Sequence, residues 1–542
     1  MSSVAVAVAD TDTDDPTPLL HDSSPYGDSA SGDEEIAPSS SSNEPEPDGS
    51  SRPNSPVGSN QRLASLDVFR GLTVALMILV DDAGGAFPSI NHSPWFGVTL
   101  ADFVMPFFLF GVGVSIGLVF KKVTNKQSAT KKVILRTIKL FLLGVVLQGG
   151  YFHGRNDLSY GVDVRKLRWL GVLQRISIGY LFASVLEIWL VNNIAVDSAL
   201  TFVKRYCIQW TAAFLLVLVY MSLLSGLYVP DWNYEVLSTN TSSTSRYGSG
   251  TQILISDDNT NLYGLASRLC YRVHCGMRGS LEPACNAVGL VDRFILGVDH
   301  LYQHPVYRRT KILDQLIFPV QQECSVNSPD YGPLPQNSPE WCLAPFDPEG
   351  ILRIDSIMEL AELFRVYGHM QRVFLWSVSS FPLLISGYVL FVLGIPLSKP
   401  LYTLSYMCIT AGASGFLLTI IFYIVKMDDL KVNHKMDDSV SALTFTTLVD
   451  VKHVKKPAMV LQWMGMNALI IYALGACDLF PAALQGLYWR SPENNLVDGT
   501  ELLLQSMLHS RKWGTLAFVV LEILFWGLVA GFLNMKRFYV RL

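Results

Sequence analysis

One short segment of the chain gathers ionisable side chains between two apolar stretches. Asp81 ends the first stretch, His92 lies in the polar connection that follows, and Asp102 opens the second stretch. Histidine titrates near neutral pH, so it can act as a general base or carry an acyl group. The carboxylates can orient the ring and stabilise its cation. The segment therefore predicts a catalytic group, with a solvated histidine in an interfacial turn as the alternative.

The rest of the chain, which must position this group, is mostly apolar. It has 542 residues, of which 50% are hydrophobic and 16% are charged, whereas soluble domains carry about 25% charged residues. This composition argues against an ordinary cytosolic enzyme. A net charge of −5 without a clustered basic face also argues against a nucleic-acid-binding protein.

Ten stretches approach the ~20 residues that are needed to cross a bilayer. They are expected at 63–81, 103–120, 133–149, 170–192, 207–229, 351–370, 373–395, 401–425, 457–479 and 515–534. The stretch at 351–370 is unusually charged, but Asp355, Glu359, Glu362 and Arg365 fall on one helical stripe that can face the interior of a bundle. An amphipathic helix lying on the membrane surface is the alternative for this stretch.

The charges of the loops give the expected orientation. Lysine-rich loops at 121–132 and 426–456 and a basic C-terminus are typical of the cytosolic side. With ten spans, all three and the N-terminus lie in the cytosol, and 82–102, 150–169 and 230–350 lie in the lumen. The fold class predicted is an all-α polytopic membrane protein with about ten transmembrane helices and a long lumenal loop, 230–350.

The N-terminal region, 1–61, has a different composition from the rest. It is rich in Ser, Pro and acidic residues and poor in large apolar residues, which predicts a disordered cytosolic tail. Asp15 followed by Leu19 and Leu20 resembles an acidic dileucine signal, which predicts a lysosome- or vacuole-type membrane. A chance occurrence of this short motif is the alternative.

The long loop is expected to lie in an oxidising compartment. Five of the eight cysteines are in it, which predicts one or two disulfides and at least one unpaired thiol. Asn240 begins a glycosylation sequon there. Asn91 also begins one, but a glycan on Asn91 would cover His92, so we expect Asn91 to stay unmodified. No Cys-x-x-Cys pair occurs, and no metal site is predicted.

Several motifs resemble the heparan-α-glucosaminide N-acetyltransferase family. They lie, in family order, at 62–71 (RLASLDVFRG), 92–110, 171–176 (GVLQRI), 299–305 (DHLYQHP), 346–351 (FDPEGI) and 463–468 (WMGMNA). The resemblance spans residues 62–542 and implies a transmembrane acyltransferase domain. It implies transfer of acetyl from cytosolic acetyl-CoA to the amine of a terminal glucosamine in the lysosomal lumen.

The resemblance also implies roles for individual residues. His92 falls on the catalytic histidine of the family, and Asp102 matches the family's acid. Asp81 stands where the family has an asparagine, which matters because an amide can donate a hydrogen bond and an ionised carboxylate cannot. The charged stretch 352–370 is a second departure. The acidic tail stands where the family carries an additional lumenal domain.

The mechanism requires a binding site for acetyl-CoA, whose phosphates favour a basic cytosolic vestibule. Gln174, Arg175 and Asn467 are the candidates, although Arg175 could instead be a cytosolic anchor of its span. His300 and His304 are candidates for binding sugar, with a structural role in the loop as the alternative. The expected partners are acetyl-CoA, an amino-sugar acceptor, the lipid bilayer and a second copy of the chain.

Three functions remain open at this point. His92 could carry the acetyl group as an acyl-imidazole or could deprotonate the attacking amine. A polytopic transporter is the alternative to an enzyme, because ten spans and intramembrane charge also fit transport. An inactive structural homologue is the third interpretation, and it is favoured by Asp81 and by the charged stretch.

Overall fold

The fold was analysed in a computed structural model. The structure describes residues 64–87, 89–93, 95–120, 125–148, 167–190, 207–238, 251–253, 267–302, 340–353, 369–433, 455–476, 484–491 and 494–539. The predictions for the tail 1–61 with Leu19 and Leu20, for Asn240, for His304 and for most of 351–370 lie outside these residues. Residues 62–542 form one compact unit, and it is described by itself.

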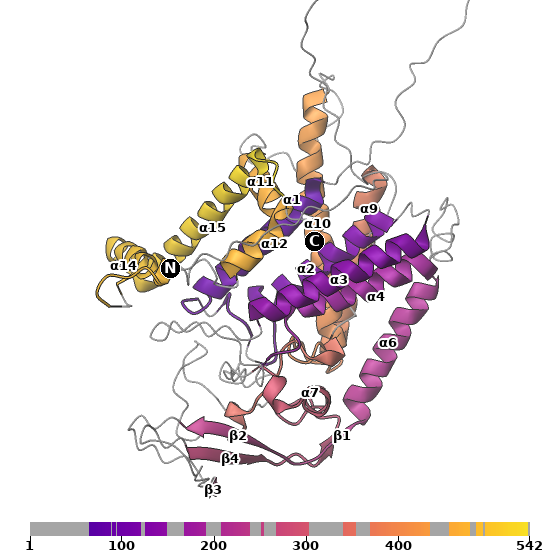
Figure 1. Cartoon of the computed structure of the whole chain (residues 1–542). Helices are drawn as coiled ribbons and strands as arrows, with labels where there is room; N and C mark the ends of the chain where they lie inside the picture. The colour runs from indigo at the N-terminus through magenta and orange to yellow at the C-terminus, as the bar shows by residue number, and fades with distance from the viewer. Residues whose placement is uncertain are drawn as a thin grey trace, which may run out of the picture. The chain divides into compact units, whose positions relative to one another are not determined.

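Helices occupy nine of the ten expected spans (Figure 1). They are α1 (Ala64–Ala83), α2 (Leu100–Val119), α3 (Lys126–Gln148), α4 (Val172–Leu190), α6 (Cys207–Gly226), α9 (His369–Val392), α10 (Leu404–Asn433), the consecutive pair α11 (Lys455–Met466) and α12 (Ala468–Ile471), and α15 (Arg511–Met535). Their bounds lie within a few residues of those expected, except that α3 begins and α10 ends in the neighbouring polar sequence.

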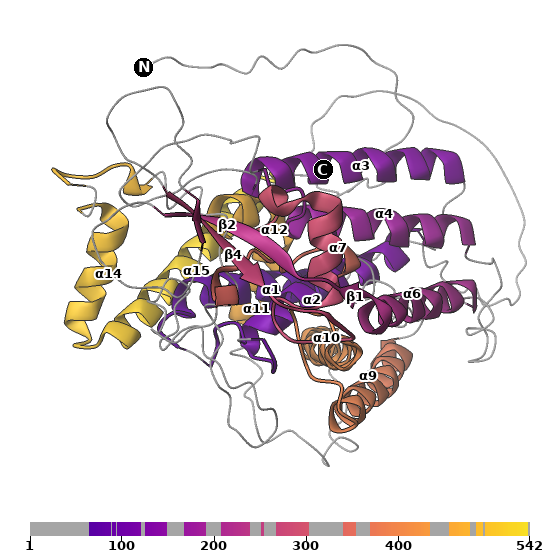
Figure 2. The ribbon, with the colours of Figure 1, turned by 90° about the horizontal axis from the view of Figure 1, so that it is seen from below.

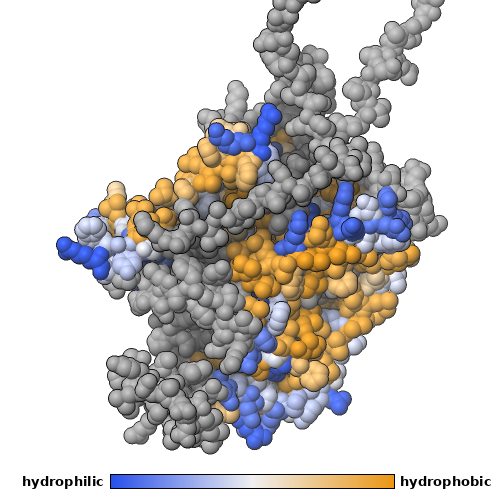
Figure 3. Space-filling model, in the orientation of Figure 1, coloured by the Kyte–Doolittle hydropathy of each residue, from blue (hydrophilic) through white to orange (hydrophobic). Residues whose placement is uncertain are grey.

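Among the described residues, four helices are long and apolar enough to cross a membrane. These are α2, α4, α15 and the part of α10 up to Val425. Residues Ala458–Met466 and Ala468–Gly475 would together form a fifth span, although they are bent by 79° at Asn467. Apolar side chains also gather on the surface over the helices, with hydrophilic ones above and below them (Figure 3). The structure thus supports a membrane protein with four or five candidate spans, and the count of ten stays a prediction.

Small residues let neighbouring helices approach closely. A Cβ atom on Gly71 of α1 would lie 1.8 Å from the carbonyl oxygen of Leu461 in α11, and one on Gly465 would lie 1.8 Å from that of Asp67. Close contact of this kind is how helices associate in a membrane, where lipid offers no hydrophobic driving force. The two glycines thereby explain part of the motifs at 62–71 and 463–468.

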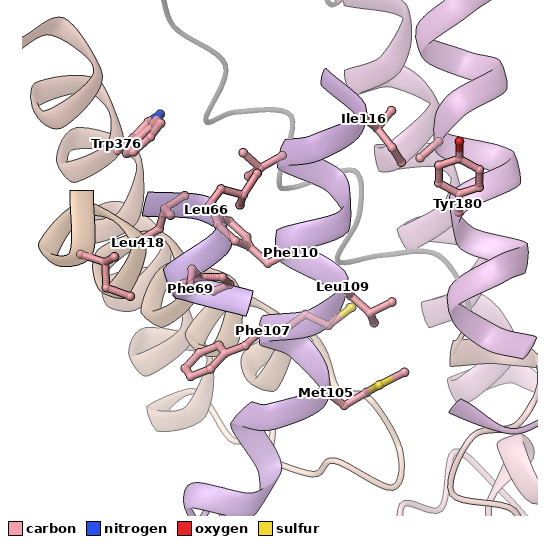
Figure 4. Packing of buried hydrophobic residues seen from close by; sticks show 14 of the residues in the cluster. Leu66, Phe69, Met105, Phe107, Leu109, Phe110, Ile116, Tyr180, Trp376 and Leu418 are labelled. Atoms are coloured by element: carbon pink, nitrogen blue, oxygen red, sulfur yellow. The ribbon is translucent and has the colours of Figure 1, made fainter. Parts of the chain in front are cut away.

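A hydrophobic core joins α1 and α2 to helices far away in the sequence (Figure 4). Phe69 and Phe110 are fully buried with their ring centroids 6.1 Å apart. Trp376 of α9 and Tyr180 of α4 belong to the same cluster. Helices α3 and α4 lie side by side, as do α9 and α10 (Figure 2). This core fixes the directions in which α1 and α2 run, and hence the place of the loop between them.

The long loop contains β-structure, which corrects the prediction of an all-α fold. A three-stranded antiparallel sheet has the order β2-β4-β3, from strands Trp232–Ser238, Ser267–Val273 and Thr251–Ile253, and β1 (Tyr228–Val229) pairs with β5 (Met277–Arg278). Helix α7 (Ala287–Leu296) follows. The strands are short and lie among turn residues, so a search for apolar runs of about 20 residues does not detect them.

The disulfides of the loop agree with the prediction. Cys275 and Cys285 are joined, and Cys342 is also disulfide-bonded. Cys270 is a free thiol, in agreement with the odd number of cysteines in the loop.

Helix α14 (Leu496–Met507) is a second element that the sequence did not predict. It begins after Asn495, and the side chain of Asn495 accepts a hydrogen bond from the Asp498 amide. At 12 residues this helix is too short for a span.

Candidate active site

The loop between α1 and α2 is organised by the first turn of α2. Thr99 precedes the helix and Asp102 lies three residues later, and the two form a reciprocal capping box. Asp102 Oδ2 accepts hydrogen bonds from the Thr99 amide at 3.0 Å, the Thr99 hydroxyl at 3.1 Å and the Ser93 amide at 3.1 Å. Three donors on one oxygen hold Asp102 as an ionised acceptor, and its side chain is only 1% exposed.

The other oxygen of Asp102 faces His92. Its Oδ1 lies 3.1 Å from His92 Nδ1, so the structure brings together two of the three residues that the sequence predicted. A carboxylate only accepts hydrogen bonds, so this contact is a hydrogen bond in the tautomer that carries its proton on Nδ1. Nε2 then keeps its lone pair, which is the state that a general base or a nucleophile requires. The ring is 26% exposed and can therefore be reached from outside.

Asp81 is placed differently from His92 and Asp102. It is exposed in the last turn of α1, as is Asp82. Asn91, in contrast, is only 8% exposed, and its Oδ1 accepts a hydrogen bond of 2.8 Å from the His92 amide. An amide side chain thus lies directly beside His92. Sequence reasoning considered Asn91 only as a glycosylation sequon, and the burial of this side chain argues further against a glycan there.

Lys399 is the residue of this site that sequence reasoning missed. Its Nζ lies 2.9 Å from His92 Nδ1 and 3.6 Å from Asp102 Oδ1. It belongs to the turn 396–403 between α9 and α10, which is 307 residues away from His92 in the sequence. The only sequence signal is a polar turn between two apolar stretches, and such turns are common. Tertiary structure was needed to find it.

A chain of aromatic contacts connects Arg175 with the same site. The Arg175 guanidinium lies over the ring of Tyr402 at 4.5 Å, and Tyr402 packs edge-on against Tyr406. The Tyr406 hydroxyl donates a hydrogen bond to the backbone carbonyl of Asp102. Arg175 is 2% exposed. Its position in the interior argues against a simple anchor at a membrane surface.

The candidates for binding acetyl-CoA are buried side chains of the bundle. Gln174 follows Leu173, which packs with Met77, Val80 and Ala101 at the end of the bundle that carries His92. The basic cytosolic vestibule expected for the phosphates stays a prediction. The amide of Gln174 is fully buried and has no hydrogen-bond partner among the described residues. Asn467, 2% exposed, is at the bend between α11 and α12.

A second charged cluster lies beside the loop that contains the sheet. The Arg168 guanidinium contacts Asp347 at 2.6 and 3.1 Å and Glu349 at 2.7 Å, and it lies over the ring of Tyr302. Burial opposes the charge of Arg168, but the two carboxylates outweigh burial and raise the pKa of the guanidinium above its ordinary value. The cluster explains the motif at 346–351 as a structural one.

His300 is a neighbour of this second cluster. Its Nδ1 lies 2.8 Å from the carbonyl oxygen of Leu167, and its ring lies 5.8 Å from that of Trp169. These contacts favour the structural interpretation of His300 over sugar binding.

Among the residues that the structure describes, no group of three or more His, Cys, Asp or Glu side chains could hold a metal ion.

Part of the chain is similar in sequence to known proteins. Residues 62–232 match the family described as "Heparan-alpha-glucosaminide N-acetyltransferase, catalytic". This part of the chain is similar in sequence to the heparan-α-glucosaminide N-acetyltransferases. The mouse enzyme of that name is 29% identical over 266 residues, which are 47% of this chain and 35% of the mouse protein. The human enzyme is 30% identical over 261 residues, 45% of this chain and 33% of the human one.

The family match covers the residues of the candidate site only in part. Asp81, His92, Asp102, Gln174 and Arg175 lie inside the matched residues, and Lys399 and Asn467 lie beyond them. The chain spans about a third of the length of the curated relatives. The match therefore shows similarity to this family over residues 62–232, and the activity, substrate and mechanism are matters for proposal.

Proposed function

We propose that this protein transfers acetyl from acetyl-CoA to the amine of a terminal glucosamine-type sugar and that His92 is its catalytic residue. The observation that carries the proposal is the contact between His92 Nδ1 and Asp102 Oδ1 in a segment that matches the family. It leaves His92 Nε2 as a lone-pair donor on a partly exposed ring. Asp102 is then the residue that orients the imidazole.

The transfer forms one bond and breaks another. The amine nitrogen becomes bonded to the acetyl carbon, the carbon–sulfur bond of the thioester breaks, and coenzyme A leaves as the thiol. The amine must lose a proton, which His92 Nε2 accepts in the direct route. In the covalent route Nε2 first takes the acetyl group, and the amine then displaces it. A cationic imidazole arises in both routes, and the Asp102 carboxylate stabilises it.

The developing oxyanion of the acetyl group needs hydrogen-bond donors. Asp81, when ionised, cannot be one, so the exposed Asp81 is assigned no donor role. The Asn91 amide beside His92 is the nearest side chain of the type that the family uses. Gln174 and Arg175 lie at the same end of the bundle, so we assign them to the acetyl-thioester end of acetyl-CoA rather than to its phosphates.

The proposal extends to the orientation of the protein in the membrane. His92 and the loop with its disulfide face the lumen of a lysosome- or vacuole-type compartment, and both termini face the cytosol. The disulfide Cys275–Cys285 supports an oxidising environment for the loop. Acetyl-CoA arrives from the cytosol, the sugar arrives from the lumen, and ten spans with a homodimeric assembly remain part of this proposal.

Transport is the second candidate function, and one observation favours it. The break of 79° at Asn467 gives a discontinuous helix with a buried amide, a feature that transporters use to bind substrates. The same bend would also serve an enzyme in which a thioester must enter the bundle. The inactive-homologue interpretation depends on Asp81, whose exposure reduces the importance of that substitution.

One assay distinguishes the three functions. Purified protein in detergent is incubated with labelled acetyl-CoA and glucosamine, and the acetylated sugar is separated and counted. We expect product from the parent and none from His92→Ala. Uptake of sugar by reconstituted vesicles without acetylated product would support a transporter. The absence of both product and uptake would support an inactive homologue.

A further inference from the structure

The turn between α9 and α10 places a cation against the imidazole of His92. Lys399 Nζ lies 2.9 Å from His92 Nδ1 and 3.6 Å from Asp102 Oδ1, and the last two atoms lie 3.1 Å apart. The three atoms form a triangle in which one ring nitrogen faces both an ammonium and a carboxylate. The Lys399 side chain is 20% exposed, so solvent screens the contact only in part.

The turn is attached to the loop that carries His92. The Ser398 hydroxyl donates a hydrogen bond of 2.9 Å to the carbonyl oxygen of Trp95, and the Gly97 amide donates one of 2.7 Å to that of Leu397. Within the turn, the buried Thr403 hydroxyl donates to the Pro396 carbonyl at 2.7 Å. These bonds fix the backbone on both sides of Lys399 relative to His92, so its position is built by the fold.

The triangle allows two arrangements of protons that exclude each other. When Nδ1 carries a proton it donates to Asp102, and Nε2 is free to react. When Nδ1 is bare it accepts a hydrogen bond from the Lys399 ammonium, and the single ring proton is on Nε2. A doubly protonated ring would place its positive charge beside the ammonium. Repulsion between like charges makes that third state unfavourable, whereas Asp102 favours it.

We propose that Lys399 is a positioning residue whose charge disfavours the imidazolium of His92 and so keeps the ring uncharged in acidic surroundings. This inference rests on the catalytic role proposed for His92. Asp102 alone would stabilise the imidazolium and would remove the Nε2 lone pair as the pH falls. Lys399 opposes that effect through its charge and extends the working range of His92 toward lower pH. An acidic lumen would require such a device.

Other charged or ionisable groups act on His92, Asp102 and Lys399 less directly. Arg175 of α4 acts through the ring of Tyr402, and the Tyr406 hydroxyl of α10 is bonded to the backbone of Asp102. Asp81 and Asp82 of α1 are exposed, so solvent screens their charges. Lys399 and Asp102 contact the ring directly, and we therefore expect them to dominate its titration.

The test measures the titration of His92 without requiring acetyl transfer. Diethylpyrocarbonate modifies uncharged imidazole, so the rate of His92 modification is followed by mass spectrometry from pH 4 to 9 in purified full-length protein. We expect Lys399→Met to move the midpoint of His92 upward by about 1–3 pH units, as expected for loss of a neighbouring like charge. Lys399→Arg keeps the charge and should restore most of the parent midpoint.

A matched control replaces a lysine that does not touch His92. Lys512 is exposed in the first turn of α15, and Lys512→Met should leave the midpoint unchanged. Size-exclusion profiles and thermal unfolding check that each variant is folded. If Lys399→Met does not fold, carbamylation of Lys399 in the folded parent removes the same charge and allows the same comparison.

The possible outcomes separate this inference from the proposed function. An upward shift in Lys399→Met alone, together with a matching shift in the acidic limb of the transfer rate, supports the inference. A midpoint within about 0.3 pH unit of the parent overturns it, because a contacting charge should have a larger effect. In that case the transfer activity can still be present. A shift in the modification midpoint without any transfer activity keeps the electrostatic inference and rejects the enzyme.

Discussion

Two charged clusters in this molecule are built from similar residues but differ in how their charges are balanced. In the cluster of His92, one oxygen of Asp102 faces two nitrogens, and the imidazole and the lysine are 26% and 20% exposed. In the cluster of Arg168, the guanidinium is 13% exposed and contacts two carboxylates, one of them in bidentate geometry.

This difference separates a site for chemistry from a structural connection. The Arg168 guanidinium stays charged at every accessible pH, because the carboxylates raise its pKa further. It links residue 168 to residues 347 and 349, which are about 180 positions later. The His92 cluster contains a group that changes its charge near neutral pH and offers a nitrogen to a substrate. Buried charge by itself therefore does not identify an active site.

The largest effect that would test the comparison is expected for His92→Ala. Loss of a general base should reduce kcat by about 10²–10⁴-fold, and loss of an acyl carrier should leave almost no transfer. The measurement is kcat in monodisperse protein, with acetyl-CoA binding checked by calorimetry. Transfer within about threefold of the parent would remove His92 from the mechanism.

Arg168→Met should have the opposite profile. It removes the Arg168 guanidinium from Asp347 and Glu349, and breaking a buried ion pair on one side costs about 3–5 kcal/mol of stability. We expect a clear decrease in the unfolding temperature, while the modification midpoint of His92 in the molecules that remain folded is unchanged. A changed midpoint with unchanged stability would make the Arg168 cluster part of the active site.

Gly465→Ala tests whether packing of α1 on α11 supports the loop of His92. The added Cβ would lie 1.8 Å from the backbone oxygen of Asp67, and overpacking of this kind costs about 1–3 kcal/mol. The matched control is Gly499→Ala in α14, where the added Cβ has no neighbour within 4 Å. There we expect a gain of up to about 1 kcal/mol from helix propensity. Thermal unfolding of both variants gives the comparison, and equal effects would contradict the close contact.

The smallest effect is expected at a third cluster, where solvent screens the charges. The backbone amide of Cys275 and the ring of His274 hold the pKa of Asp231 below its ordinary value. Because its pKa is lowered, Asp231 stabilises the folded state at pH values above its unfolded pKa of about 3.9. The folded state loses this contribution as the pH falls through the folded pKa. The difference in unfolding temperature between the parent and Asp231→Asn should therefore be small at pH 6 and should disappear in strong acid. If the difference in unfolding temperature grew toward low pH, the pKa of Asp231 would be raised rather than lowered.

Much of the helical framework follows from the sequence because apolar length is a local property. A helix that crosses or packs in a membrane needs about 20 apolar residues in succession, and this requirement located nine of the described helices within a few residues. The presence of a disulfide and of an unpaired thiol in the long loop follows from counting, whereas the structure identifies Cys275, Cys285 and Cys270 as the residues concerned. The strands of the long loop did not follow, because their short pairing depends on partners about 35 residues away.

The pairing of His92 with Asp102 was within reach of the sequence, and the rest of the site was not. Ten residues and one capping box separate the two side chains, so local structure nearly decides their contact. Lys399 reaches His92 because α10 packs against α2 and because Ser398 and Leu397 bond to the loop. Arg175 is likewise connected with Asp102 only through Tyr402 and Tyr406, which come from a distant part of the sequence. Sequence alone determined which residues could do chemistry, and tertiary structure decided which of them meet, since contacts between distant segments depend on the packing of whole helices.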